Sequence, residues 1–334
     1  MDSRGRAATY WTFGFVRSIL LAAVVTSGVT ARATYAEGDL RRQGLLEWGV
    51  YQIYWRANYG AHLAQQVERL ASQPDYVMFY RDLSRPFPSK AIDAIRSFGA
   101  TPIISLELWN WHGGEKDHLW RIAAGEYDNH FRRWAQDAKR HGGRVLLRFG
   151  FEFNGNWFTW GGDPEHFVRA WRRVRKIFDD VGASNVEWVW APNVTSHPEG
   201  RDNDMEHYWP GGRYVDWVGV DGYNWGDDYD EWHRWSSFEE VFGEVLDRFA
   251  KRYRGKPVMI AEFGCVEGTP GRKAAWIRDA HASVLRRPQV KAVVWFNFDK
   301  RRERELNWRI DSSPESLKAF NETFAAVRGA AAGR

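Results

Sequence analysis

The chain alternates short apolar runs with segments whose apolar residues recur at helical spacing. Leu63, Val67 and Leu70 recur in this way before one of the runs. Eight runs have the length and the β-branched and aromatic content of buried strands. They are Gly49–Tyr54, Tyr76–Tyr80, Thr101–Leu108, Arg144–Phe153, Val186–Ala191, Val215–Tyr223, Pro257–Phe263 and Val290–Phe298.

Capping signals mark the ends of several helical segments between these runs. Asp163 and Pro164 open one segment, and Gly182 closes it. Ser237 and Glu240 have the spacing of a capping box at the start of another. The apolar runs and the helical segments therefore follow one another along most of the chain.

This alternation predicts a parallel sheet with right-handed crossovers. Eight units in roughly 290 residues predict a closed (β/α)₈ TIM barrel, in one domain over residues 37–334. The segment 194–214 is weakly helical, so one unit is expected to be irregular. In such a barrel, chemistry takes place at the carboxyl ends of the strands.

Residues 1–36 have the pattern of a signal peptide. Arg4, Arg6 and Arg17 form a basic region, and residues 18–29 form an apolar stretch of twelve residues. This stretch is too short to span a bilayer comfortably. We expect a secreted or periplasmic protein without stable membrane association; the alternative is an uncleaved membrane anchor.

Charge and cysteine content narrow the function further. The formal charge of +4 falls to +1 without residues 1–36, which hold four arginines and one aspartate. No strong nucleic-acid footprint remains, and no nucleic-acid partner is expected. Cys265 is the single cysteine, which excludes an internal disulfide, and its position favours packing over reactivity.

Tryptophan is unusually abundant, with 20 residues in 334. A tryptophan buries a large area and offers a flat face. Enzymes with many tryptophans often stack sugar rings or other flat ligands on some of them. The alternative for any single tryptophan is packing in the core.

Two glutamates lie at or near the ends of predicted strands. Glu152 lies near the end of the fourth run, where Arg148, Gly150, Glu152 and Asn154 share one face of a regular strand. Glu262 lies near the end of the seventh run. Paired carboxylates at one barrel mouth are the machinery of glycoside hydrolysis. Either glutamate alone could be an ordinary exposed residue.

Several segments resemble glycoside hydrolase family 26, a family of retaining (β/α)₈ barrels that includes β-mannanases and β-1,3-1,4-glucanases. The resemblance covers roughly residues 45–325, and the Glu-x-Asn-Gly-x-Trp motif at 152–157 is its most specific part. The matching segments are RFGFEFNGNWFTW at 148–160, WVWAPN at 188–193, DWVGVDGYN at 216–224, AEFG at 261–264 and VVWFN at 293–297.

The resemblance implies roles for these residues. Glu152 is expected to be the general acid/base and Glu262 the nucleophile. Tyr223 resembles the tyrosine that donates a hydrogen bond to the nucleophile, although it could also be a packed residue. Trp295 resembles the platform under the sugar at the cleaved bond.

The remaining candidates are supporting or substrate-binding residues. Trp157 and Trp160 resemble walls of the leaving-group side. Arg148 is expected either to orient a glutamate inside the barrel or to form an ion pair with Glu107. Asn154 and Asn193 are further candidates for contacts with the substrate.

Phe151 departs from the family pattern, because a histidine usually precedes the acid/base. Phenylalanine cannot form a hydrogen bond with the sugar 2-hydroxyl. Mannose and glucose differ only in the orientation of this hydroxyl, so the sugar is left open. Asn154, Asn193 or Trp295 could read it instead. Alternatively, a regular strand would turn Phe151 toward the surrounding helices.

The resulting hypothesis is a secreted, retaining endo-β-glycanase that cleaves a polysaccharide, most plausibly β-1,4-mannan. The alternatives are a β-1,3-1,4-glucanase, a hydrolase that trims the cell's own exopolysaccharide, and a non-catalytic sugar-binding barrel. No cofactor is required, and a monomer is expected. No cysteine and histidine cluster suggests zinc, and residues 227–231 are expected to form a solvated acidic loop rather than a calcium site.

Overall fold

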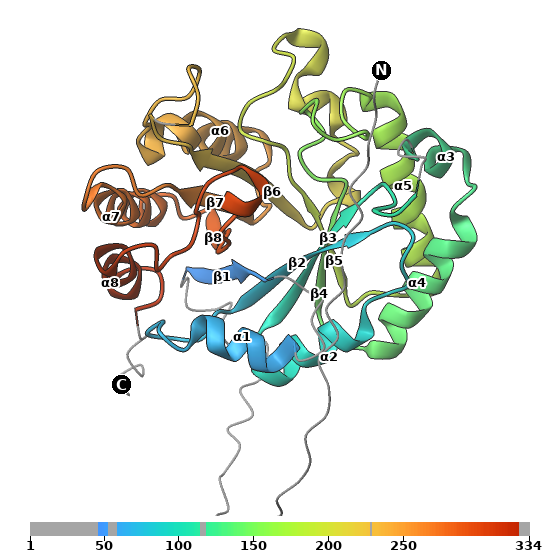
Figure 1. Cartoon of the computed structure of the whole chain (residues 1–334). Helices are drawn as coiled ribbons and strands as arrows, with labels where there is room; N and C mark the ends of the chain where they lie inside the picture. Colours follow the sequence, from blue (N-terminus) through green and yellow to red (C-terminus); the bar gives the residue numbers. More distant parts are fainter. Residues whose placement is uncertain (1–45, 53–58, 114–117, 228, 327–334) are drawn as a thin grey trace, which may run out of the picture. The chain divides into compact units, whose positions relative to one another are not determined.

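The computed structural model describes residues 46–52, 59–113, 118–227 and 229–326. Eight parallel strands pair in chain order and close into a barrel (Figure 1). The predicted TIM barrel is therefore confirmed. The strands are β1 Glu47–Tyr51, β2 Tyr76–Asp82, β3 Thr101–Glu107, β4 Val145–Phe149, β5 Val186–Trp190, β6 Trp217–Asn224, β7 Val258–Cys265 and β8 Val290–Trp295.

Helices lie around the outside of the strands (Figure 1). The predicted irregular segment 194–214 contains three short 3₁₀ turns: η2 Arg201–Asn203, η3 Met205–Tyr208 and η4 Gly212–Tyr214. A fourth turn, η5 Arg301–Glu303, follows β8. The α-helices are α1 Tyr59–Val67, α2 Ser89–Phe98, α3 Leu119–Ala124, α4 Asp128–His141, α5 Pro164–Val181, α6 Phe238–Arg252, α7 Arg272–Leu285 and α8 Pro314–Glu322.

The predicted caps are present on α5 and α6. The Asp163 side chain accepts a hydrogen bond from the backbone N–H of His166, and Gly182 ends α5 in the left-handed conformation. Ser237 and Glu240 form a complete capping box at the start of α6. These bonds satisfy backbone groups that a helix end leaves without partners.

The fourth strand is shorter than the sequence pattern predicts. It ends at Phe149, because Gly150 and Glu152 both adopt positive φ angles, of 55° and 48°. A Cβ atom at Gly150 would lie 2.8 Å from Leu108 Cδ1 and would be strained at this φ angle, so glycine is favoured there. Residues 150–153 therefore form a turn at the barrel mouth, and the alternation of a regular strand does not continue through them.

A polar cluster lies at the amino ends of the strands. Two nitrogens of Arg144 donate to the carboxylate of Glu187, each at 3.0 Å, and Trp217 Nε1 donates to the same carboxylate at 2.6 Å. Arg144 precedes β4, Glu187 is the second residue of β5, and Trp217 is the first residue of β6. In barrels of this kind, this end serves stability and the opposite end carries chemistry.

The predicted signal peptide, residues 1–36, lies outside the described residues. Within the described ranges, none of the helices combines the length and the apolar character that crossing a membrane requires.

Candidate active site

Glu262 lies on β7 and is 3% exposed. Three side chains donate hydrogen bonds to its carboxylate. Tyr80 Oη and Arg148 Nη1 donate to Oε1, at 2.7 and 2.5 Å, and Tyr223 Oη donates to Oε2 at 2.7 Å. The hydrogen bond expected between Tyr223 and Glu262 is thus present.

The two phenols are fixed as donors. Burial, followed by the charge of Glu262, raises the pKa of both Tyr80 and Tyr223 well above the ordinary value. Each phenol therefore keeps its proton and directs it at Glu262. Donors that are in place before any reaction hold a carboxylate in one orientation without later reorganisation.

Arg148 is fully buried on β4 and joins Glu262 to a second carboxylate. Its Nη2 donates to Asp221 on β6, and its Nη1 also contacts Ser105 Oγ at 2.9 Å. The predicted alternative, an ion pair between Arg148 and Glu107, is wrong, because Arg148 pairs with Glu262 and Asp221 instead. Arg148 is thus placed to orient Glu262, the other role expected for it.

Glu152 lies three residues beyond the end of β4, in the turn with positive φ. A non-glycine residue in this conformation costs on the order of 1–3 kcal/mol. Hydrogen bonds hold the turn: Glu152 N donates to Ala191 O at 2.8 Å, and Gly155 N donates to Glu152 O at 2.9 Å. The strained backbone sets the direction of the Glu152 side chain, which is 8% exposed.

The environment of the Glu152 carboxyl differs from that of Glu262. Trp157 Nε1 donates to Oε2 at 2.6 Å and Asn193 Nδ2 donates to Oε1 at 2.9 Å, but neither donor carries a charge. Burial, followed by the negative charge of Glu262, raises the pKa of Glu152 from 4.5 to about 7. Glu262 contacts a guanidinium directly, whereas Glu152 contacts none, so the proton is favoured on Glu152.

Asn154 supports the loop that carries Asn193. Its side-chain oxygen accepts from Asn193 N at 2.8 Å, and its Nδ2 donates to Asn193 O at 3.0 Å and to Ser196 Oγ at 3.2 Å. Asn154 is fully buried. It therefore positions a hydrogen-bond donor of Glu152 and does not itself face the open mouth.

Glu107 ends β3 and accepts a hydrogen bond from Trp111 Nε1. Burial raises the pKa of its carboxyl to about 7, although the tryptophan donors oppose the shift. The charges of Asp82 and Glu262 add to the increase. Glu107 is thus a further carboxyl that can hold its proton near neutral pH on the same side of the barrel.

Phe151 does not turn toward the surrounding helices, so the alternative drawn from strand alternation is wrong. The guanidinium carbon of Arg148 lies 4.7 Å from the Phe151 ring centroid, and the Tyr80 ring lies 5.4 Å away. Phe151 therefore covers the two donors to Oε1 of Glu262. Trp160 is 1% exposed and donates through Nε1 to Phe151 O at 2.8 Å, so it supports this turn and is not an open wall.

The prediction that Trp295 lies under the sugar is wrong in this structure. Trp295 is fully buried, its Nε1 donates to Trp308 O at 2.7 Å, and its ring packs against Phe263. The following residue, Phe296, is the aromatic side chain near the mouth. Its ring stacks on the Tyr51 ring, with the centroids 4.6 Å apart, and its centroid lies 5.9 Å from that of the Tyr223 ring.

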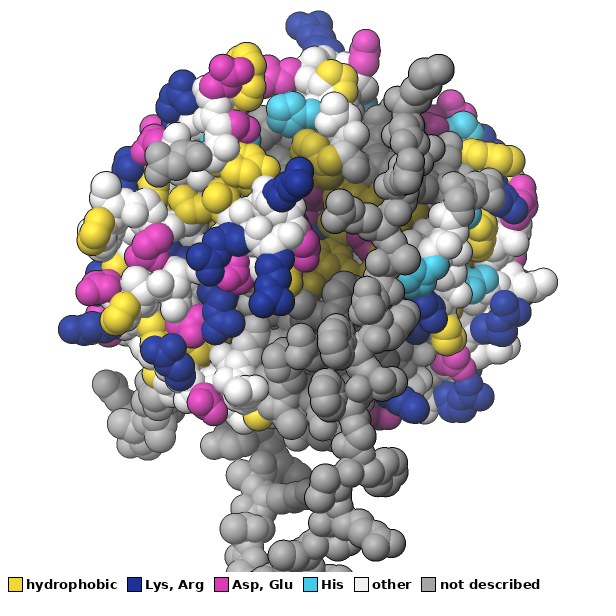
Figure 2. All heavy atoms as spheres, in the orientation of Figure 1, with side chains coloured by type: hydrophobic (Ala, Val, Ile, Leu, Met, Phe, Trp, Pro, Cys, Tyr) yellow, Lys and Arg dark blue, Asp and Glu magenta, His cyan; other side chains and the backbone are white. Residues whose placement is uncertain are grey.

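Trp157 is the exposed aromatic residue beside the acid. It is 41% exposed while its Nε1 is bound to Glu152, so one face of the indole remains open. Figure 2 shows hydrophobic and acidic side chains together in a recess near the middle of the face turned to the viewer. An aromatic face beside a proton donor suits a ring-shaped, hydroxyl-bearing leaving group.

Two residues of the site were missed by the sequence reasoning. Tyr80 is the last residue of the predicted second run, so it lies at a carboxyl strand end, where chemistry is expected in such a barrel. Asp221 is a fully buried carboxyl in the apolar sixth run, where an unpaired charge would be unfavourable. Its Oδ1 has no partner among the described residues, and burial raises its pKa well above the ordinary value.

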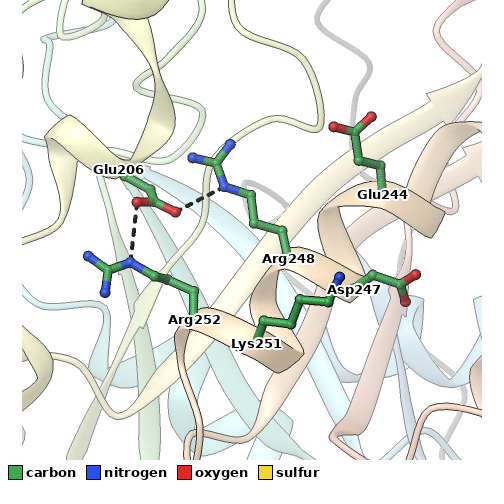
Figure 3. Close-up of a pocket in the computed structure, with 6 residues that line it drawn as sticks. All are labelled: Glu206, Glu244, Asp247, Arg248, Lys251 and Arg252. Carbon is green, nitrogen blue, oxygen red and sulfur yellow. Dashed lines mark hydrogen bonds and ion pairs between the residues drawn. The ribbon is translucent and has the colours of Figure 1, made fainter.

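A hollow of about 530 Å³ lies on the outside of α6 (Figure 3). Glu206 accepts from Arg248 Nε at 3.0 Å and from Arg252 Nε at 3.2 Å, and Asp204 also accepts from Arg248. These pairs tie η3 to α6, and none of the carboxyls described above lines the hollow. Its remaining lining residues are Glu244, Asp247 and Lys251.

The described ranges contain no group of three or more histidine, cysteine, aspartate or glutamate residues that could hold a metal ion. In the loop after β6, Asp227 accepts from Trp235 N and Arg272 Nη1, and Asp230 accepts from Trp232 N and His233 N. These two carboxylates therefore serve to fix the loop.

A closed barrel with two glutamates at its mouth is the arrangement found in glycoside hydrolases. Residues 125–258 match the model of glycosyl hydrolase family 26. The chain is 35% identical to endoglucanase H of Acetivibrio thermocellus over 242 residues, which cover 70% of this chain and 25% of that protein. The chain belongs to glycosyl hydrolase family 26.

Two further similarities agree with this assignment. The chain is 34% identical over 98 residues to a mannan endo-1,4-beta-mannosidase of Bacillus subtilis, which cover 26% of this chain and 25% of that protein. The solved catalytic domain of a family 26 endo-beta-1,4-mannanase from Bacillus sp. JAMB-750 has the same fold. Its TM-score is 0.63 at 17% identity, and the match covers 85% of this chain and 88% of that one.

The matches cover only parts of the relatives and of this chain. The chain spans a quarter of the length of these two curated relatives. The family model matches a segment that includes Glu152 but ends at Val258, four residues before Glu262. The roles of the individual residues therefore rest on the geometry.

Proposed function

We propose that the chain is a retaining endo-β-glycanase in which Glu262 is the nucleophile and Glu152 the general acid/base. The observation that carries this proposal is the asymmetry of the two carboxyls. Glu262 contacts the cation Arg148, whereas the buried Glu152 contacts none and has its pKa raised to about 7. A nucleophile must be ionised and an acid must hold a proton, and the two environments supply these states.

In the first step, Glu262 attacks the anomeric carbon while Glu152 gives its proton to the departing glycosidic oxygen. Oε1 of Glu262 accepts from two donors, Tyr80 and Arg148, whereas Oε2 accepts from Tyr223 alone. Oε2 keeps more of its lone-pair density and is the attacking atom. In the second step, Glu152 removes a proton from water, which attacks the anomeric carbon and releases Glu262.

We propose β-1,4-mannan as the substrate. The support is the similarity to proteins named as mannan endo-1,4-beta-mannosidases and the resemblance of the catalytic segments to that family. The open face of Trp157 next to Glu152 would hold the ring of the leaving group. The rest of the polymer would extend along the mouth.

A β-glucan is the second candidate, and two observations favour it. The relative matched over 70% of this chain is named an endoglucanase. In addition, Phe151 offers no hydrogen bond to a 2-hydroxyl and packs over Arg148, so this position does not select the mannose configuration.

The test measures new reducing ends released by purified protein from β-1,4-mannan, β-1,3-1,4-glucan, β-1,3-xylan and bacterial exopolysaccharides. Mannan should react fastest; faster hydrolysis of mixed-linkage glucan selects the second candidate. A 2-deoxy-2-fluoro glycoside of the preferred sugar should trap the nucleophile. Labelling of a residue other than Glu262, or inverted products, would refute the mechanism.

We also propose that the protein is exported, because residues 1–36 have a basic region followed by a twelve-residue apolar stretch. A polymeric substrate outside the cytoplasm fits this location. Amino-terminal sequencing of the mature protein from the periplasm and the medium tests it. A protein that begins at Met1 and stays in the cytoplasm would contradict the proposal.

A further inference from the structure

The loop between β6 and α6 carries a row of aromatic side chains that begins at the nucleophile. Tyr223 donates to Glu262, and its ring centroid lies 5.9 Å from that of Trp225. Both rings pack against Trp308, with centroid distances of 4.8 and 4.9 Å. The ring centroid of Trp225 in turn lies 4.7 Å from that of Tyr229. The row leads from the catalytic carboxylate to the surface.

Trp232 lies at the outer part of this loop and is 80% exposed, the largest value among the exposed apolar side chains of the described residues. Tyr229 is also exposed, at 37%. No ring contact of the Trp232 indole occurs within the described ranges. Leaving so large an apolar surface in water forgoes burial that would be favourable, at ~25 cal/mol per Å².

The loop is nevertheless held in place. The Asn224 side-chain oxygen accepts from Gly226 N at 3.2 Å and from Ser236 N at 3.1 Å, which joins the two ends of the loop. At the outer part, Asp230 Oδ1 accepts from Trp232 N and His233 N, each at 2.9 Å. The backbone of Trp232 is thus fixed while its ring faces solvent.

We propose that Trp232 and Tyr229 form a distal sugar-binding site, on which a ring of the same β-linked polysaccharide stacks outside the position of cleavage. This inference rests on the proposed function. The row from Glu262 through Tyr223 and Trp225 ends at Tyr229, and Trp232 lies three residues further along the same loop, so one polymer chain can extend from the catalytic mouth to this loop. The C–H face of a pyranose ring matches a flat, fixed indole, and the ring hydroxyls remain in water.

The test compares Trp232→Ala with the wild type on the polysaccharide that the wild type cleaves and on a short aryl glycoside of the same sugar. The KM for the polymer should rise about three- to tenfold, the range of one aromatic stacking contact. The short substrate should react unchanged. Trp232→Phe, which keeps a flat face, should restore most of the affinity for the polymer.

Trp120→Ala is the matched control, because Trp120 is also exposed, at 47%, but lies on α3 outside the aromatic row. It should behave as the wild type on both substrates. Native gels containing the polymer, run with Glu262→Gln and with Glu262→Gln/Trp232→Ala, measure binding without hydrolysis. The double variant should migrate faster.

The outcomes separate the two proposals. If the wild type cleaves the polymer and Trp232→Ala binds and cleaves it equally well, the distal site is refuted and the catalytic proposal stands. An equal loss with Trp120→Ala would also refute the site. If the wild type neither binds nor cleaves any of the polysaccharides, both proposals fail.

Discussion

Replacing Glu152 with glutamine should make the protein less sensitive to rising pH. In the folded protein the pKa of Glu152 is about 7, against an ordinary value of 4.5. The folded state therefore keeps a proton between these pH values that the unfolded chain has released. Its stability falls as the pH rises from about 4.5 through 7 and then levels off.

The size of the effect follows from the shift. A difference of roughly 2.5 pKa units at 1.36 kcal/mol per unit corresponds to about 3 kcal/mol, most of which develops between pH 5 and pH 8. Glutamine has nearly the same shape and no titration. Its single amide oxygen can accept from only one of the two donors, Trp157 and Asn193. This loss does not change with pH, so it cancels when the two pH values are compared.

The assay is urea unfolding of the wild type, Glu152→Gln and the exposed control Glu244→Gln at pH 5 and pH 8. Between these pH values the wild type should lose roughly 2–3 kcal/mol more unfolding free energy than Glu152→Gln. Glu244→Gln should follow the wild type. Equal pH dependence in all three proteins would show that Glu152 is not held protonated by its burial, and would remove the main support for its role as the acid.

Three further predictions concern the site and the packing around it. Activity on polymer should fall as the pH rises through about 7, as Glu152 loses its proton. Asn193→Ala should move this fall in kcat/KM to higher pH by about one pH unit, because it removes a donor to the carboxylate. A fall that moves to lower pH would contradict this. Tyr80→Phe should lower kcat about 10- to 100-fold, the equivalent of one hydrogen bond to a charged Glu262, with little change in Tm. An unchanged kcat would show that this hydrogen bond does not contribute to catalysis. Trp295→Ala should cost about 3–5 kcal/mol of stability and leave KM nearly unchanged in the folded fraction; a large loss of turnover with a normal melt would restore the platform role.

The sequence predicted the barrel well because its signals are local and repeated. Apolar runs recur eight times, and helix caps such as those of α5 and α6 act through residues three or four positions apart. Glu152 and Glu262 were found because the barrel rule places strand ends together. The two helices between β3 and β4, α3 and α4, were not predicted, and the first of them has only six residues.

The sequence could not place side chains whose direction depends on where a strand stops. Two positive φ angles end β4 at Phe149, and Phe151 consequently turns onto Arg148. At β8 the aromatic residue predicted at the mouth is displaced by one position, because Trp295 packs outside the barrel and Phe296 reaches the mouth. Such choices are set by contacts between distant segments, which a reading of strand alternation does not contain.

The bridge from Glu262 through Arg148 to Asp221 has a consequence for charge balance during turnover. In the proposed mechanism Glu262 loses its negative charge when it becomes an ester with the sugar, and Asp221 then remains as the carboxyl partner of Arg148. Loss of the Glu262 charge removes one of the causes that raise the pKa of Asp221, so the ionised form of Asp221, already bonded to Arg148, is favoured at that stage. The guanidinium of Arg148 is therefore bonded to a carboxyl in both halves of the proposed cycle, through a side chain that is fully buried below the mouth.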